Sequence, residues 1–429
     1  MVSAKSASLS SIAACSFVLI LTVSPLRAQG TDEYIVQFQS GTPAALRRAA
    51  AASAGATARF VFNAVSAVAV RVPNDQVMAA LMRNPAVVGI LPNRPVVAYQ
   101  NGRAAGSNNN KGGGTQSQIL PAGVVRVGVP TPSSNGAGIG VAILDTGIDL
   151  AHSDLAVATS GFSAVGATCQ DDHGHGTHVA GTVAARDNGT DVVGVAPAAQ
   201  LYCVKVLDGN GSGSDATIMA GLDWVLTNHD RVVPAIKVIN LSLGRPGTVG
   251  DNPAMHAIFS SLDAAGISVV AAAGNDPQAD VSGQIPAAYP EVIAVASTTA
   301  QNGSNQCRFL AGSIAADTAS YFTTDGHGVT VSAPGEDRED VNRSCFITSV
   351  GILSTRLGGG TVRMSGTSMA SPHVAGIAAR YYQQNSTMLP SDIKVWIATS
   401  AIRQTVAPLE SPTTSYTYDG VKEGIAQAP

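Results

Sequence analysis

The most informative stretch of the sequence is Gly366-Thr367-Ser368-Met369-Ala370-Ser371-Pro372-His373-Val374-Ala375-Gly376. Gly366 permits a tight turn, and Pro372 is expected in a first helical turn, where a missing N–H costs nothing. Ser368 therefore stands at the start of a helix whose following residues are small and apolar. Free N–H groups and the positive dipole end at such a position suit a hydroxyl nucleophile that generates an oxyanion. A lone serine there is usually an N-cap, so its chemistry requires a base from elsewhere in the chain.

Length and composition restrict the class of protein. A chain of 429 residues is too long for one ordinary domain and suggests a large domain with a smaller one. The 45 glycines and the aromatic content of 5% indicate a loop-rich α/β protein. A net charge of -4 without a basic block gives no support for nucleic-acid binding, and no internal apolar run could span a bilayer.

The N-terminus has the features of an export signal. Lys5 precedes an apolar run over residues 12–23, and small residues near Ala28 offer a cleavage point. We predict a signal peptide over residues 1–28 and a secreted protein with no membrane attachment after its removal. A lipid anchor on Cys15 is rejected because the apolar run follows this cysteine.

Four further cysteines, an even number in an exported chain, predict two disulfides. Three pairings are possible. The favoured one joins neighbours in sequence, Cys169 with Cys203 and Cys307 with Cys345.

Residues 31–100 predict a small domain. Strand and helix patterns alternate as strand, helix, two strands, helix and a final extended segment over residues 87–97, which suits a ferredoxin-like α+β unit. Residues 101–117 carry almost no apolar side chains and should form a flexible linker that contains a processing site.

Residues 118–405 predict an α/β domain with a parallel sheet covered by helices on both faces. Its strands are continuous apolar runs, which indicates burial on both sides. Strands are expected over 140–144, 201–207, 237–243, 267–272, 292–296 and 329–332, and helices over 175–185, 215–226, 253–264, 368–382 and 391–397. Residues 406–429 are a C-terminal tail.

The ends of these elements supply a complete nucleophile set. Asp145 follows a buried strand, His175 opens a helix beside glycines, and Asn275 follows Gly274 after another strand. With Ser368 as nucleophile, His175 would transfer the proton and Asp145 would orient the imidazole. The Asn275 amide and the Ser368 N–H would hold the oxyanion.

A metal cluster at His173, His175 and His178 is the alternative interpretation of the histidines. The sequence lacks the glutamate of a zincin motif, and His178 lies one turn inside the helix, where a packed structural role is expected.

Three blocks, Asp145–Asp149, His175–Gly181 and Gly366–Gly376, resemble the subtilisin-like serine proteases (subtilases), and their Asp, His, Ser order is that of subtilisin. The resemblance implies an endopeptidase that acts on polypeptides, a monomer being expected. It implies that substrate binds as an added strand between two segments, beside the oxyanion segment that ends at Asn275. The residues concerned are Gly211, Ser212, Gly213, Ser242, Leu243, Gly244, Ala273 and Gly274. The S1 pocket, which receives the substrate side chain before the scissile bond, would involve residues 282–286; this segment departs in length from the best-known members, so specificity is left open.

The resemblance also implies an inhibitor-type propeptide and a calcium site. Residues 31–100 resemble the propeptide that assists folding and inhibits the enzyme, and cleavage is expected after Tyr99 or within the linker. The implied structural Ca²⁺ would take side-chain oxygens from Gln118, Asp154 and Asn188 and carbonyl oxygens from Arg186, Thr190 and Val192. An ordinary surface turn is the alternative for this loop.

Two other classes of function share these features. A serine esterase could use the same residues, and a secreted binding protein could keep the fold without catalysis. The complete nucleophile set argues against the second, and the substrate-strand segments favour peptides over small esters.

Overall fold

The structure is a computed structural model that describes residues 32–99, 117–129, 133–402 and 419–429. The predicted signal peptide over residues 1–28 lies outside the described residues, and so does almost all of the predicted linker over residues 101–117.

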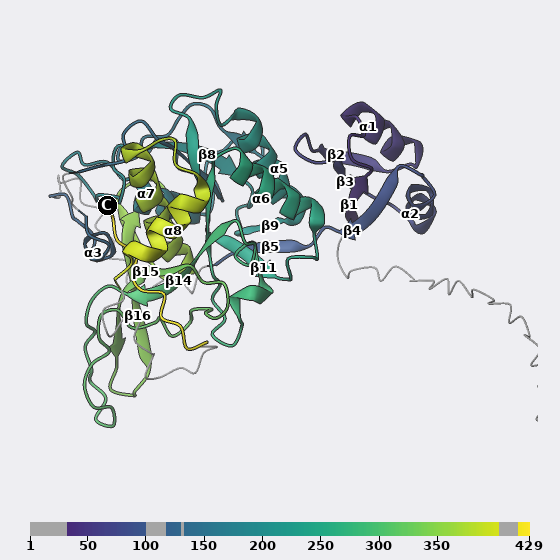
Figure 1. Ribbon diagram of the computed structural model, residues 1–429. Coiled ribbons are helices and arrows are strands. Elements are labelled where there is room, and N and C mark those ends of the chain that lie inside the picture. Colours follow the sequence, from purple (N-terminus) through teal and green to yellow (C-terminus); the bar gives the residue numbers. More distant parts are fainter. Residues whose placement is uncertain (1–31, 100–116, 130–132, 403–418) are drawn as a thin grey trace, which may run out of the picture. The chain divides into compact units, whose positions relative to one another are not determined.

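The small N-terminal domain has the predicted ferredoxin-like arrangement (Figure 1). Its sheet has the antiparallel order β2-β3-β1-β4. Apolar residues on one face of the sheet pack against the two helices and form a core of their own. The elements are β1 Glu33–Phe38, α1 Ala44–Ser53, β2 Thr57–Val61, β3 Ala67–Arg71, α2 Asp75–Met82 and β4 Val87–Pro92.

The extended segment predicted over residues 87–97 is two strands that belong to different sheets. β4 pairs with β1, whereas β5 (Pro95–Ala98) pairs with strands of the larger domain. Between them, buried Asn93 donates to Glu33 Oε2 at 2.9 Å and accepts from the Ala216 N–H at 2.9 Å. Asn93 therefore fixes the point at which the chain passes to the other domain.

The larger domain is built on a nine-stranded sheet of order β17-β16-β15-β14-β12-β10-β6-β8-β7. The pairs from β15 to β7 are parallel, as predicted, but β16 and β17 extend the sheet with antiparallel pairs. The bounds are β6 Gly140–Asp145, β7 Phe162–Ser163, β8 Gln200–Lys205, β10 Ile236–Leu241, β12 Ser268–Ala272, β14 Val292–Thr299, β15 Val331–Val341, β16 Ile347–Thr355 and β17 Thr361–Met364.

Helices cover both faces of this sheet. Along β6, Val141 and Ile143 belong to one apolar core and Ala142 and Leu144 to the other, because successive side chains point to opposite faces. The first core includes α4 and α7, and the second includes α5 and α6. The helices are α3 Ala122–Arg126, α4 His175–Ala184, α5 Asp215–Asn228, α6 Pro253–Ala264, α7 Thr367–Gln384 and α8 Pro390–Ser400.

The prediction that Pro372 lies in the first turn of its helix is wrong. α7 begins at Thr367, so Pro372 lies inside the helix. A proline here leaves the carbonyl four residues earlier, that of Ser368, without its intrahelical donor. The Ser242 hydroxyl donates to this carbonyl at 2.8 Å, which satisfies it and ties α7 to the end of β10.

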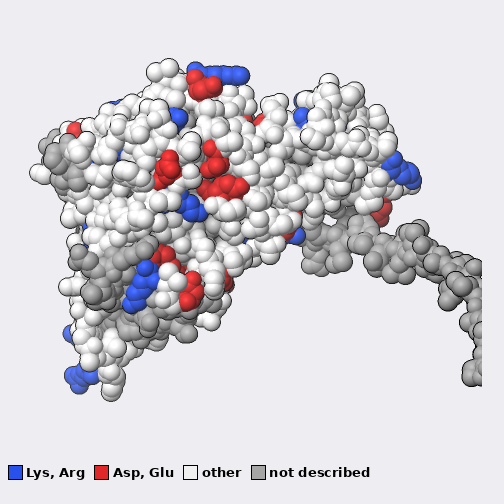
Figure 2. All heavy atoms as spheres, in the orientation of Figure 1, with Lys and Arg blue, Asp and Glu red and all other residues white. Residues whose placement is uncertain are grey.

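Both predicted disulfide pairings are confirmed. Cys169 is bonded to Cys203 and Cys307 to Cys345, with Cα–Cα distances of 6.1 and 4.9 Å. Among the described residues, no helix has the length and apolar character that crossing a membrane requires. On the face drawn in Figure 2, charged side chains are scattered among uncharged ones.

The end of the C-terminal tail packs on the larger domain. Ile425 and Ala426 are completely buried, and Ile425 exchanges backbone hydrogen bonds with Ile402. The Ala428 N–H donates to the Val127 carbonyl at 2.7 Å. The described part of the tail is thus an integral part of the domain's packing.

Candidate active site

Asp145 and His175 form a buried hydrogen-bonded pair. Asp145 is the last residue of β6 and His175 the first of α4, and neither is exposed to solvent. Gly174 adopts a left-handed φ of 101°, which turns the chain into the helix. His175 Nδ1 lies 2.7 Å from Asp145 Oδ1, so the carboxylate orients the ring and leaves Nε2 available for chemistry. Within the described residues, Nε2 has no hydrogen-bond partner.

Ser368 lies in the first turn of α7, where backbone N–H groups have no intrahelical acceptor. Its hydroxyl donates to the Ser242 carbonyl at 2.9 Å, and the structure shows no hydrogen bond from this hydroxyl to His175 in the part of the chain it describes. Ser242 thus holds the serine by two bonds, one to its hydroxyl and one to its carbonyl.

Asn275 is oriented by the residue before Ser368. Its Oδ1 accepts from the Thr367 N–H at 3.0 Å and from the Thr367 hydroxyl at 2.8 Å. Two donors on Oδ1 fix the orientation of the amide. The Nδ2 group therefore points away from Thr367. It is buried and has no partner among the described residues. An unsatisfied buried donor next to a candidate nucleophile is suited to bind an oxyanion.

The predicted substrate segments form the two sides of a cleft. They lie in or next to β9 (Ser212–Ser214) and β11 (Leu243–Pro246), and β13 (Gln284–Ile285) pairs with β11. Strand β5 of the N-terminal domain lies between β9 and β11 and pairs antiparallel with both, in a four-stranded sheet of order β13-β11-β5-β9. The cleft therefore holds an extended peptide through main-chain hydrogen bonds.

Comparison with known proteins identifies the family. A model of the subtilase family matches residues 136–424, which is more than half of the chain. The chain belongs to the subtilase family.

Several relatives have similar sequences over most of the chain. The thermostable alkaline protease of Halalkalibacterium halodurans is 37% identical over 303 residues, which cover 70% of this chain and 71% of the relative. Subtilisin E of Bacillus subtilis is 36% identical over 285 residues, 65% of each chain, and Subtilisin Savinase of Lederbergia lenta is 37% identical over 272 residues, 62% of this chain and 86% of the relative. The chain is a subtilisin-like serine endopeptidase, and the comparisons favour this activity over the esterase and non-catalytic alternatives.

Two other histidines near this site are buried and lie within hydrogen-bond distance of backbone carbonyls. His178 Nε2 lies 2.9 Å from the Ile352 carbonyl, and His373 Nδ1 lies 2.8 Å from the Met369 carbonyl. Burial lowers the pKa of His178 to about 3 and that of His373 to about 4, so both rings are neutral at ordinary pH. No three His, Cys, Asp or Glu side chains converge as a metal-binding group within the described ranges.

The predicted calcium ligands gather around one loop. Gln118 Nε2 donates to the Arg186 carbonyl at 2.7 Å and lies 3.4 Å from the Val192 carbonyl. Buried Asp154 accepts from Asn188 Nδ2 at 2.9 Å and from the Val192 N–H at 3.3 Å. The sixth predicted residue, Thr190, donates through its N–H and its hydroxyl to Asn188 Oδ1.

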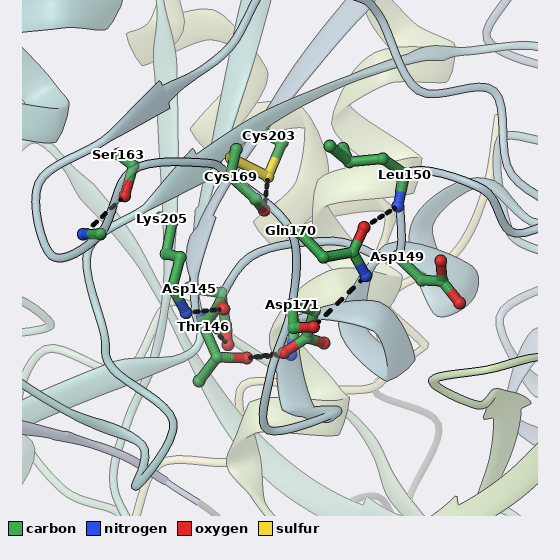
Figure 3. The surroundings of a disulfide bond; sticks show 12 residues. Asp145, Thr146, Asp149, Leu150, Ser163, Cys169, Gln170, Asp171, Cys203 and Lys205 are labelled. Carbon is green, nitrogen blue, oxygen red and sulfur yellow. Dashed lines mark hydrogen bonds between the residues drawn. A yellow bond between two sulfur atoms is a disulfide. The ribbon is translucent and has the colours of Figure 1, made fainter.

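Asp171 bonds to Thr146, the residue after Asp145 (Figure 3), and also to the helix that begins at His175, although the sequence pattern assigns it no role. Its Oδ1 accepts from the hydroxyl of Thr146, at 2.9 Å, and from two N–H groups that precede α4. Its Oδ2 accepts from the N–H and the hydroxyl of Thr177. The signal that could have found it is an acidic residue just before a helix start, where the dipole favours a negative charge.

The disulfide holds the Asp171 segment from the other side. Cys169 is bonded to Cys203 of β8, which pairs with β6, and the backbone around Ile148 bonds to both Cys169 and Asp171. Asp171 is thus a positioning residue, since it contacts the helix start and the strand end but neither reacting side chain directly.

We expect Asp171→Asn to lower the activity and the stability of the mature enzyme. The new amide nitrogen would replace an oxygen that now accepts hydrogen bonds from neighbouring N–H and hydroxyl groups, which should reduce the free energy of unfolding by about 2–3 kcal/mol. His175 would be held less firmly in position, which should reduce kcat more than it changes KM. Asp230→Asn is the matched control, because it makes the same change at an exposed position. Thermal unfolding and steady-state kinetics of both variants test this; equal behaviour would contradict the positioning role.

Proposed function

We propose that this endopeptidase is made as a precursor that cleaves itself, and that Ser368, His175, Asp145 and Asn275 perform both this cleavage and the hydrolysis of substrates. The observation that carries the proposal is the position of β5 in the substrate cleft. The Tyr99 N–H donates at 3.3 Å to the Ser242 carbonyl, the same carbonyl that accepts the Ser368 hydroxyl. The peptide bond that begins at Tyr99 is therefore next to the proposed nucleophile.

The proposed reaction uses each side chain for one task. Ser368 Oγ attacks the carbonyl carbon of Tyr99 and passes its proton to His175 Nε2, which then gives it to the leaving amine. Water, deprotonated by His175, cleaves the resulting ester and frees Ser368. This step requires the hydroxyl to rotate from the Ser242 carbonyl toward His175, a change of one side-chain torsion. Asp145 holds the ring through Nδ1 and stabilises the imidazolium.

The oxyanion of the tetrahedral intermediate would be bound by Asn275 Nδ2 and the Ser368 N–H. The Asn275 amide is already oriented by Thr367, so little reorganisation is needed when the charge develops. In subtilisin, a relative of this chain, a side-chain donor of this kind contributes about 10²–10³ in kcat.

The N-terminal domain is proposed to act as an inhibitor through contacts beyond β5. Asp223 of α5 accepts from the Asn63 and Ala64 N–H groups at 2.8 and 2.6 Å and from Asn63 Nδ2 at 3.2 Å. Arg94, which precedes β5, forms an ion pair with Asp251. Together with β5 these contacts keep the cleft filled until the N-terminal domain leaves or is degraded.

We further propose a structural calcium ion at the loop around Asp154. Without a cation, burial raises the pKa of Asp154 to about 7, because the Val192 and Asn188 donors compensate only part of the lost hydration. The remaining groups are neutral oxygens of amides and carbonyls, a donor set that suits Ca²⁺. The ion would join the segment around Gln118 to the body of the domain.

Export is proposed on the basis of the sequence signal and the two disulfides. Disulfides are typical of proteins that fold outside the cytosol.

Ser368→Ala should abolish both peptidase activity and self-cleavage, so that the purified protein keeps its N-terminal domain covalently attached. In subtilisin, loss of the nucleophile costs about 10⁶ in kcat. N-terminal sequencing and mass spectrometry of wild type and variant, each purified from a protease-deficient host, measure the outcome. A Ser368→Ala protein that matures at the wild-type rate would show that another residue is the nucleophile.

Asp223→Ala should weaken inhibition by the N-terminal domain without changing kcat on a short peptide. Hydrogen bonds to a charged acceptor contribute about 1.5–3 kcal/mol, which predicts a rise in the inhibition constant of about 10- to 100-fold. Asp230→Ala is the control, because it removes the same charge from an exposed position. The inhibition constant of added polypeptide 31–99 is measured for the three mature enzymes. If the two variants shift it equally, long-range charge and not the Asp223 contacts holds the domain.

Chelation should shorten the lifetime of the mature enzyme at elevated temperature and leave its initial rate at low temperature unchanged. A ligand that binds only the native state stabilises it by about 4 kcal/mol at 1,000 times its Kd. Asp154→Ala should reproduce the loss and make the lifetime independent of added calcium, whereas Asp187→Ala, an exposed carboxylate in the same loop, should behave like wild type. Inactivation half-lives with EDTA and with calcium provide the measurement. A wild-type half-life that is the same in both would argue against the ion.

A further inference from the structure

Tyr99 occupies a pocket that is shaped for an aromatic ring. Gly244 forms one wall: a Cβ atom there would lie 2.5 Å from Tyr99 Oη and 2.6 Å from Tyr99 Cε2. Real atoms do not approach so closely, so only glycine admits the ring. Gly274, next to Asn275, lies close to Gln284, since a Cβ atom there would be 3.6 Å from Gln284 Cγ. The wall at Gly244 therefore belongs to the segment that begins at Ser242, the residue bonded to Ser368.

Gln284 lies where the tip of the ring ends. Its side-chain Oε1 accepts the Tyr99 hydroxyl at 2.8 Å, and the residue is 6% exposed. The backbone of Gln284 is fixed by β13, which pairs with Pro246 of β11, and its carbonyl accepts from the Ala288 N–H at 2.7 Å. The acceptor is thus held in place by the sheet and not by a mobile loop. Burial raises the pKa of the Tyr99 hydroxyl, so it remains a protonated donor.

No pattern in the sequence indicates this contact, since Gln284 and Tyr99 are far apart in the chain. The segment 282–286 was expected near the S1 pocket, but no residue type in it pointed to a preference.

We propose that Gln284 is a specificity-determining residue that makes the S1 pocket select tyrosine over phenylalanine. This inference rests on the proposed function, because it takes Tyr99 as the residue before the bond that is cleaved. A phenylalanine fills the same space but leaves the Gln284 oxygen without its donor in a buried position. A site built to bond a hydroxyl discriminates against the analogue that lacks it.

The same geometry disfavours the longer cationic side chains. Arg245 follows Gly244, is itself buried, and bonds to Asp215 and Asp251. Its charge acts on the Tyr99 hydroxyl, where it opposes the effect of burial on the pKa. A lysine or arginine that reached Gln284 would bury an ionised group beside a neutral acceptor, so the preferred donor at the pocket floor is a neutral phenol.

The test compares mature wild type, Gln284→Met and Gln278→Met on three peptides. Each peptide carries the sequence Val-Val-Ala-X before the scissile bond, as in residues 96–99, with X as Tyr, Phe or Lys. Methionine matches glutamine in length and removes the acceptor. Gln278→Met makes the same change at an exposed position a few residues away.

Wild type and Gln278→Met should cleave the Tyr peptide about tenfold more efficiently than the Phe peptide in kcat/KM, and the Lys peptide least. In Gln284→Met the Tyr/Phe ratio should fall to about one while the Phe peptide is still cleaved. A wild-type ratio near one, an unchanged ratio in Gln284→Met, or a Lys peptide as good as the Tyr peptide would each overturn the inference. Failure of wild type to cleave any peptide would overturn the proposed function instead, and this inference with it.

A second measurement does not depend on the Gln284 variant folding. Tyr99→Phe in the full-length wild-type chain should slow self-cleavage about tenfold, as followed by the loss of precursor over time. Self-cleavage at the wild-type rate would overturn the inference.

Discussion

The start of α7 is anchored to the ends of two strands, and the site depends on this anchoring. Pro372 frees the Ser368 carbonyl, and the Ser242 hydroxyl at the end of β10 bonds to it. Thr367 bonds to Asn275 beyond β12. Since the carboxyl ends of parallel strands meet at one edge, these bonds bring the proposed nucleophile, the proposed oxyanion donor and the proposed substrate cleft to the same place. A proline that would normally weaken a helix is here the reason that the helix can be fixed to the sheet.

The proposed inhibition and the proposed substrate binding use the same main-chain groups. β5 pairs with β9 and β11 through backbone hydrogen bonds, which any sequence could make. The main-chain bonds therefore accept peptides of any sequence, and selection between peptides must come from side-chain pockets or from contacts outside the cleft. The Asp223 and Arg94 contacts belong to the second kind, and they are available to the N-terminal domain but not to a short peptide. These outside contacts would let the protein distinguish the proposed inhibitor from a substrate, even though both are proposed to bind as the same strand.

The sequence predicted the parts of the fold that rest on local pattern. The continuous apolar runs located the parallel strands within a few residues, and Asp145 and Asn275 follow their strands as expected. The run over 329–332 continues as β15 to Val341 through charged residues, which no apolar pattern reveals. Burial and the nearby Glu339 raise the pKa of Glu336, which lies inside the sheet. The Asp171 network and the contact of Gln284 with Tyr99 join distant segments, and only the folded chain brings them together.

The proposed maturation and the proposed specificity are coupled because one pocket serves both. Gln284 and Gly244 lie against Tyr99 at the end of the N-terminal domain, and substrates would enter the same space once that domain has left. A substitution in this pocket that changes the choice of substrate therefore also changes how well the chain processes itself. Tyr99 and Gln284 are consequently constrained as a pair. If Tyr99 loses its hydroxyl, the Gln284 oxygen becomes a buried acceptor without a donor, so a substitution at one position should be better tolerated when the other position changes with it.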